Sequence, residues 1–251
     1  MANRSTLEPK VAAAGSAADL FALARECFDE PADMAYAKDI LTSAAFTGAE
    51  DAKKALDKVA GDAMFTKDFV TLAIGYQALG DAGKAGEMLS QGADFAMDGS
   101  EKVSVGMGHW LALGDAAAAG KALAGALKEV SATEELYGLA AVVAELNNAE
   151  LFGQIADKIK AKAGRAADFA RLAKLLASRG DKAKATELIH EGAAKYGSPA
   201  DLIVLSGAMG EIDPAAAGAL YDKALESAKD FTALTQVLAA AAGNAEFTKA
   251  V

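Results

Sequence analysis

Side chains that could perform chemistry are few in this sequence of 251 residues. Of its two histidines, His109 and His190, neither has the spacing of a His-Glu-x-x-His metal motif. A single cysteine, Cys27, cannot form an intramolecular disulfide or a thiolate-based metal site. Cys27 also falls in an apolar helical pattern, which is typical of a small buried residue. These residues therefore predict neither a metal centre nor a reactive nucleophile.

Glycine motifs give no catalytic signal either. The sequence contains no Gly-x-Ser-x-Gly elbow and no Gly-x-x-x-x-Gly-Lys-Ser/Thr phosphate loop. A Gly-x-Gly element, Gly106-Met107-Gly108, lies in a predicted helix, whereas a dinucleotide site needs a strand, a turn and then a helix. We therefore expect a protein that is not an enzyme and that has no cofactor and no bound metal.

Composition and charge narrow the classes of partner. Hydrophobic residues make up 53% of the chain and aromatic residues only 6%, which suits thin, Ala-rich helices that pack closely. A net charge of −10 argues against nucleic-acid binding and against docking on an anionic membrane, although it also serves solubility. We find no apolar run of about 18 residues and no signal peptide at the N-terminus, so we expect no membrane insertion and a cytoplasmic location.

A recurring turn indicates which helices would position any site. Neighbouring copies are about 33 residues apart, a period typical of arrays of helix–turn–helix repeats. The copies are Gly80-Asp81, Gly114-Asp115, Asn147-Asn148, Gly180-Asp181, Asp213-Pro214 and Gly243-Asn244.

Around these turns the apolar residues recur every three or four positions, as on one face of a helix. The clearest repeats are predicted at 66–99, 100–132 and 166–198. In each repeat, small residues should let neighbouring helices approach closely. The best-matched positions are Phe69, Leu72, Ala73, Tyr76, Ala85 and Gly92, and Phe169, Leu172, Ala173, Leu176, Ala185 and Gly192.

This order of residues resembles that of tetratricopeptide repeats (TPRs), and the match is good over 66–130 and 166–198. The resemblance implies an all-α, right-handed α-solenoid whose first helices line a concave face that receives a peptide or helix. We expect a flexible N-terminal lead-in over 1–15 and a single repeat domain over 16–251. About fourteen or fifteen helices are predicted.

Two features are candidates for partner binding. His109 and Trp110 lie together in a first helix; tryptophan is common at binding hot spots, but Trp110 also fits the packing position that Tyr76 holds one repeat earlier. A basic stretch from Lys158 to Lys184 contains nine cations and only two acids, Asp168 and Asp181. We predict that its Arg165, Arg171, Lys174 and Arg179 dock an acidic partner; the alternative is that cations favour the carboxyl ends of helices.

The sequence thus favours a non-enzymatic scaffold or adaptor that captures a segment of another protein, with no role for nucleic acid. Two alternatives stay open. One is a structural subunit that braces a larger complex, which an exposed apolar strip on the array would favour. The other is an enzyme or small-molecule binder with a pocket inside the superhelix, which would require convergent polar groups.

Overall fold

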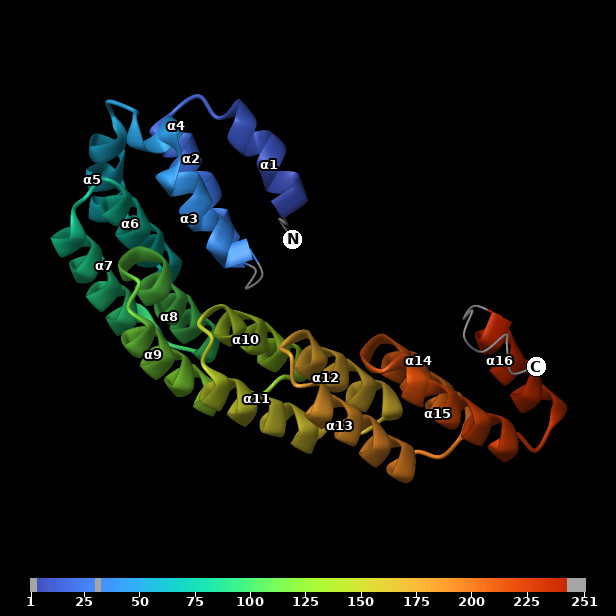
Figure 1. Ribbon diagram of the computed structural model, residues 1–251. Helices are drawn as coiled ribbons and strands as arrows, with labels where there is room; N and C mark the ends of the chain where they lie inside the picture. The colour runs from blue at the N-terminus through green and yellow to red at the C-terminus, as the bar shows by residue number, and fades with distance from the viewer. Residues whose placement is uncertain (1–3, 30–32, 243–251) are drawn as a thin grey trace. The chain divides into compact units, whose positions relative to one another are not determined.

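Helices account for nearly all of the computed structural model, which describes residues 4–29 and 33–242 (Figure 1). These ranges contain no strand, so the all-α fold is confirmed. They hold 16 α-helices and one 3-10 turn, where fourteen or fifteen helices were expected. The elements are α1 (Arg4–Ala13), α2 (Ala17–Glu26), η1 (Cys27–Asp29), α3 (Met34–Thr42), α4 (Ala44–Thr47), α5 (Ala52–Asp62), α6 (Thr66–Ala78), α7 (Ala82–Phe95), α8 (Gly99–Leu113), α9 (Ala116–Glu129), α10 (Thr133–Glu145), α11 (Ala149–Lys162), α12 (Ala166–Ser178), α13 (Lys182–Lys195), α14 (Pro199–Ile212), α15 (Pro214–Ser227) and α16 (Phe231–Ala242).

The chain divides into two compact units, residues 1–155 and 156–251, where the sequence predicted one repeat domain over 16–251. In the first unit, α6 packs on α7 and α8 packs on α9. In the second unit, α12 packs on α13 and α14 packs on α15. Helix pairs of the predicted kind therefore occur in both units, and the clearest predicted repeats each correspond to one pair.

The recurring turn has the backbone geometry that its residues suggest. Gly80, Gly114 and Gly180 adopt φ angles of 82°, 66° and 86°, in the left-handed region that favours glycine, and Asn147 adopts 54°. Each aspartate after such a glycine caps the next helix; the Asp81 carboxylate accepts the N–H of Lys84 at 3.1 Å. The turn therefore ends one helix and starts the next within three or four residues.

Small residues allow close packing within a pair, as predicted. Ala73, Ala85, Ala173 and Ala185 are all fully buried. A Cβ added to Gly92 would lie 3.1 Å from the Phe69 Cβ, and one added to Gly192 would lie 3.0 Å from the Phe169 Cβ. Two pairs separated by one hundred residues thus share the same tight contact.

The first and last helices of the described residues can be compared with the predictions for the two ends of the chain. Within the span 1–15, predicted to be a flexible lead-in, Arg4–Ala13 form helix α1, in which Leu7 is buried. The flexibility of this span stays a prediction. Helix α16 begins the last partial copy at Phe231, as predicted. Its turn, Gly243-Asn244, lies outside the described residues.

Candidate functional site

The first helices α6 and α12 start from the same template and present different surfaces. Phe, Leu, Ala, Gly and Asp occupy positions 69, 72, 73, 80 and 81, and the same residues occur one hundred positions later. The two helices differ on the face that points away from the second helix of the pair, which we name the outward stripe. On this stripe α6 has Thr71 and Ile74 where α12 has Arg171 and Lys174. Thr71 and Ile74 are buried, whereas Arg171 and Lys174 are exposed. One template therefore gives an enclosed helix in the first unit and an open one in the second.

The N-terminal helices enclose α6. Helix α2 packs against α6, and α3 packs against both α6 and α8. Helix α3 buries an apolar row made of Met34, Ala37, Ile40 and Leu41. As a result nearly every residue of α6 from Thr66 to Tyr76 is buried. The first-helix face of α6 and α8 is thus occupied by a helix of the same chain.

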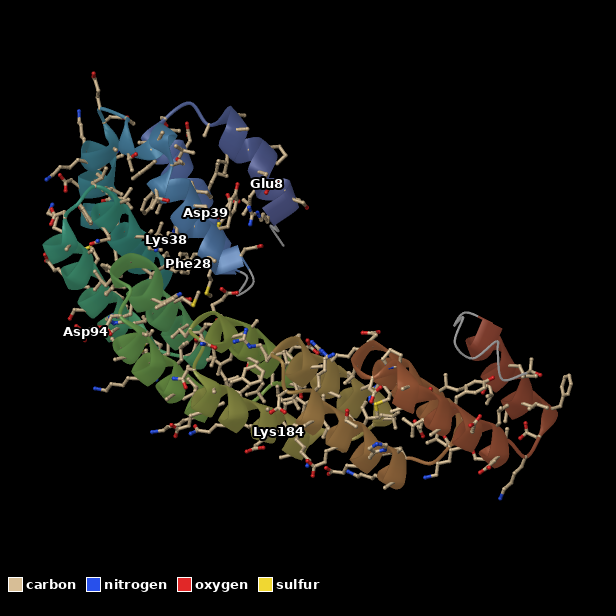
Figure 2. The ribbon with its side chains drawn as sticks, in the orientation of Figure 1. Glu8, Phe28, Lys38, Asp39, Asp94 and Lys184 are labelled. Carbon is tan, nitrogen blue, oxygen red and sulfur yellow. The ribbon has the colours of Figure 1, made fainter. Side chains whose placement is uncertain are left out.

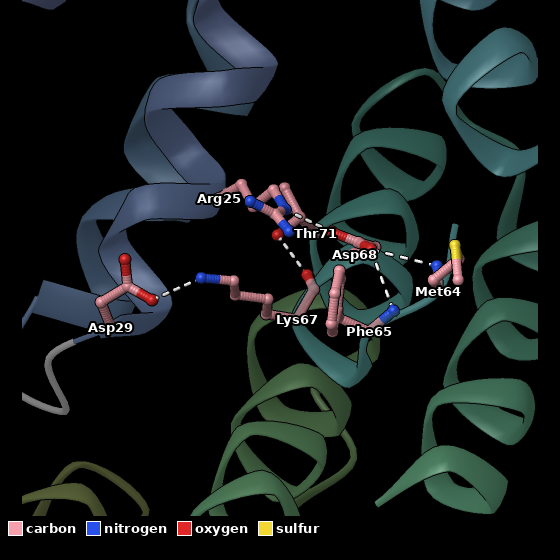
Figure 3. Close-up of polar contacts among 7 residues, drawn as sticks. All are labelled: Arg25, Asp29, Met64, Phe65, Lys67, Asp68 and Thr71. Atoms are coloured by element: carbon pink, nitrogen blue, oxygen red, sulfur yellow. Dashed lines mark hydrogen bonds and ion pairs between the residues drawn. The ribbon is translucent and has the colours of Figure 1, made fainter. Parts of the chain in front are cut away.

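Two ion pairs fix this arrangement (Figure 3). Arg25 of α2 pairs with the Asp68 carboxylate, whose side chain is only 8% exposed. The other oxygen of Asp68 accepts the N–H groups of Met64 and Phe65, at 3.2 and 3.0 Å. Asp29, at the end of η1, accepts from the Lys67 ammonium at 2.6 Å. The Asp68 carboxylate therefore caps α6 and also binds α2 through Arg25.

Asp168 makes the same cap in α12 without a partner from another helix in its ion pair. Its carboxylate accepts the N–H groups of Gly164 and Arg165, both at 3.0 Å, and its second oxygen pairs with the Arg165 guanidinium at 3.3 Å. Partial burial opposes ionisation of Asp168, but the N–H of Gly164 and the guanidinium of Arg165 outweigh it and hold its pKa below the usual value.

The basic stretch does not form one uniform surface. Arg171 and Lys174 lie one turn apart on α12, while Arg165 and Arg179 flank its two ends, about 20 Å apart for a helix of this length. Several of its cations are paired with carboxylates of the same unit. These pairs are Lys160–Glu191, Arg165–Asp168, Lys174–Glu211 and Lys184–Asp181.

The alternative explanation for the cations holds for part of the stretch. Lys160 and Lys162 lie in the last turn of α11, and Arg179 follows α12, where the helix dipole favours positive charge. Lys182 and Lys184 lie in the first turn of α13, where the dipole disfavours it (Lys184 is labelled in Figure 2). Their position is therefore not explained by the dipole.

His109 and Trp110 are half-buried on α8 in the first unit, whereas His190 is exposed. Burial lowers the pKa of His109, and the nearby Asp115 carboxylate opposes the shift only in part. The Nδ1 atom of His109 is buried and has no hydrogen-bond partner in the described chain. Burial therefore favours the neutral form of the His109 imidazole.

Cys27 is fully buried, as predicted, and its thiol donates to the carbonyl of Leu23 at 3.5 Å. Burial raises the pKa of Cys27 to about 12, which keeps the thiol protonated and unreactive. Within residues 4–29 and 33–242, no cluster of three His, Cys, Asp or Glu side chains could hold a metal ion. In the same ranges no helix is long and apolar enough to cross a bilayer.

A surface hollow of about 390 Å³ lies beside α5, α6 and α7. The Tyr76 hydroxyl donates to Asp57 at 2.9 Å, and the Lys84 ammonium donates to the same oxygen at 2.7 Å. Lys84 lies 4.8 Å from the Tyr76 ring centre. These contacts satisfy one another and join three helices.

Sequence reasoning missed the acids in the first turn of the first helices, most of which accept backbone N–H groups there, although a periodic signal was present. An acid stands at the third position of five consecutive first helices, at intervals of 33 or 34 residues. These acids are Asp68, Glu101, Glu135, Asp168 and Asp201. No sequence signal marked Arg25 as the partner of Asp68, because the two residues are 43 positions apart.

Comparison of the chain with protein families, with characterised proteins and with solved structures finds no match.

Proposed function

We propose that this protein is a non-enzymatic scaffold or adaptor that captures a segment of another protein on the first-helix face of a repeat array. In this proposal the array is TPR-like, with the right-handed superhelix and the concave first-helix face that the resemblance implies, and the protein acts in the cytoplasm. Support comes from the repeated helix pairs and from the charged, solvent-facing stripe of the second unit.

One observation carries the proposal: the first unit already holds a helix on this face. The apolar row of α3 packs on α6 and α8, and ion pairs at Arg25 and Lys67 fix the segment that precedes it. A helix laid on a groove, with apolar contacts inside and charges at the rim, is a common mode of peptide recognition. The equivalent helices of the second unit, α12 and α14, offer the corresponding face.

The exposed stripe on α12 and α14 determines which partner fits. On α12 the stripe consists of Ala167, Arg171, Lys174 and Ser178. On α14 it consists of Ala200, Val204, Gly207 and Glu211. Small residues leave room for a close approach of the partner's backbone, and two cations on α12 replace the Thr71 and Ile74 of α6. We therefore propose an acidic segment as the ligand, with Arg165 and Arg179 at the ends of α12 as further contacts.

Charge reversal tests this surface. The triple variant Arg171→Glu, Lys174→Glu and Arg179→Glu should lose capture of the partner from native lysate, while its helicity and melting temperature stay close to those of the wild type. A control with the same change in net charge is Lys53→Glu, Lys54→Glu and Lys58→Glu on α5, which should capture the partner normally. Equal capture by both triple variants would contradict the proposal.

His109 and Trp110 remain secondary candidates on α8. If Trp110 serves as an anchor for the partner, Trp110→Phe should weaken capture several-fold and leave the melting temperature nearly unchanged. If it fills a packing position, the same change should lower the melting temperature by a few degrees and leave capture intact. Thermal unfolding by circular dichroism, combined with the capture assay, separates these outcomes.

A second function, a structural subunit that braces a larger complex, is favoured by α16. Its exposed face carries Phe231, Leu234 and Leu238, which are 84%, 38% and 39% exposed and recur at helical spacing. Such a row is typical of a face that packs on another helix. A partner that copurifies at fixed stoichiometry through a salt wash would favour the brace, and one lost in the wash would favour the adaptor.

A further inference from the structure

Four large apolar side chains are exposed at one edge of the first unit. Met64 and Phe65 lie in the loop between α5 and α6, and Phe95 and Met97 lie where α7 meets α8. Their exposed fractions are 69%, 57%, 48% and 84%. We name these four residues the edge patch. Soluble monomers seldom expose contiguous apolar groups of this size unless another molecule covers them.

The repeat geometry brings the four residues together. Phe65 precedes Phe69 by about one helical turn, and the Phe69 ring lies 4.9 Å from the Phe95 ring, measured between centroids. Met64 and Met97 are chain neighbours of these aromatic residues. The Arg25 guanidinium lies 5.8 Å from the Phe65 ring centre, on the side where α2 packs (Figure 3). A Cβ added to Gly92, near the end of α7, would lie 3.7 Å from the Thr66 carbonyl oxygen at the start of α6. The four residues of the edge patch therefore lie at the same end of the pair α6–α7.

The fold does not require apolar residues at these positions. One hundred residues later the same repeat has Gly164, Arg165, Lys195 and Gly197 in place of the edge patch. That repeat forms the same pair of helices, with the same acid capping the first one. Its Phe169 packs edge-on against Tyr196, and Lys195 lies 5.6 Å from the Phe169 ring centre. The edge patch is thus a departure from the template that folding does not explain.

Charges around the edge patch specify its partner. Asp62, Asp94 and Asp98 are exposed beside it (Asp94 is labelled in Figure 2). Two nearby cations are engaged within the unit, because Arg25 pairs with Asp68 and Lys67 pairs with Asp29. Residues 1–155 as a whole contain 23 acidic and 12 basic residues, a formal charge of −11. An acidic rim around an apolar centre complements a cationic amphipathic segment.

We propose that the edge patch is a second docking surface, which binds a basic amphipathic helix of a partner protein. The partner's apolar side chains contact Phe65, Phe95 and the two methionines, whose flexible thioethers adapt to varied shapes. Lysine or arginine residues at its margins pair with Asp62, Asp94 and Asp98. This surface is distinct from the first-helix face of the second unit, so either one can bind without the other.

Binding can be measured with a defined probe. The probe is a fluorescent 18-residue peptide of Leu and Lys at helical spacing, and its counterpart carries Glu in place of Lys. Fluorescence anisotropy should show that the wild-type protein binds the Leu/Lys peptide and not the Leu/Glu peptide. The double variant Phe65→Gln and Phe95→Gln leaves the net charge unchanged and should weaken binding roughly tenfold or more, as expected for the loss of two aromatic anchors.

Matched variants keep this test decisive. The double variant Phe65→Arg and Phe95→Lys introduces the residues that the second unit carries, so it should fold normally and lose binding. A control with the same charge change, Glu50→Gln and Glu145→Gln, should bind almost as well as the wild type. Normal binding by the Phe65→Gln, Phe95→Gln variant would overturn the proposal, as would equal binding of the two peptides.

Two other possible occupants of the edge patch can be tested with the same variants. A second copy of the chain would appear as concentration-dependent association in sedimentation, abolished by Phe65→Gln and Phe95→Gln. A lipid surface would appear as flotation with phosphatidylcholine vesicles, lost in the same variant. Either result would replace the proposed partner. The charge reversals at Arg171, Lys174 and Arg179 leave the edge patch intact, so failure of one surface is distinguishable from failure of the other.

Discussion

The pair α6–α7 and the pair α12–α13 begin from one template and end in different roles. Both have the same turn, the same capping acid and the same close glycine contact. Around the first pair, α2 and α3 pack against α6, and Thr71 and Ile74 at the equivalent positions are buried and uncharged. On the second pair the stripe is exposed and carries Arg171 and Lys174. The template thus defines a structural unit, and its outward residues determine whether the unit serves as core or as surface.

The largest effect should come from exchanging the stripe residues. Ile74→Lys places a charge at a buried position of α6 and should cost more than about 3 kcal/mol, because burying an ammonium that has no carboxylate partner is costly. The reciprocal change, Lys174→Ile, should alter stability by less than about 0.5 kcal/mol, as is usual for exposed positions. Urea unfolding followed by circular dichroism measures both. Similar losses in the two variants would show that α3 does not cover α6 as described.

A smaller difference is expected for the arginines beside the capping acids. Arg25→Ala removes the partner of the buried Asp68 carboxylate and should cost about 1–3 kcal/mol, since Arg25 is itself one-third exposed. Arg165→Ala acts at a side chain that is 79% exposed and should cost less than about 0.5 kcal/mol. Denaturant unfolding measures both losses, and unfolding of Arg25→Ala, of Asp68→Ala and of the double variant gives the coupling free energy of the Arg25–Asp68 pair. A coupling near zero would show that this ion pair does not hold α2 on α6.

One change should affect the two pairs equally and so tests whether the template is truly shared. Gly80→Ala and Gly180→Ala both place a Cβ at φ above 80°, in open space on the surface. Each should cost about 1–2 kcal/mol through left-handed strain alone. Thermal unfolding of the two variants should give shifts of the same sign and similar size. A marked inequality would mean that the turns, and not only the stripes, differ between the pairs.

The last effect appears only at alkaline pH and belongs to the first pair alone. Burial, followed by the hydrogen bond to Asp57, raises the pKa of Tyr76 to about 12. The folded protein therefore keeps the phenol protonated where the unfolded chain ionises near pH 10, and the stability from Tyr76 is lost as pH rises from 10 to 12. Tyr76→Phe should flatten that part of the stability curve. Unchanged alkaline behaviour in the variant would contradict the shift.

Much of the fold could be predicted from local spacing. The turn glycines, the capping aspartates and the apolar rows all act within one helix or one turn, so they can be recognised in the sequence. The acids at the start of the first helices repeat every 33 or 34 residues and could have been recognised in the same way. Helix α1 was missed because it is short and polar and buries only Leu7.

The sequence by itself determined that this protein is an array of paired helices, because each pair is encoded by contacts a few residues apart. Only the tertiary structure decided which faces of the array are covered. It placed α3 on α6 and α8, joined Arg25 to Asp68 across 43 residues, and paired much of the basic stretch with carboxylates. It also left the edge patch exposed. The physical reason is that burial depends on which distant segment packs against a helix, and a 33-residue period carries no information about that choice.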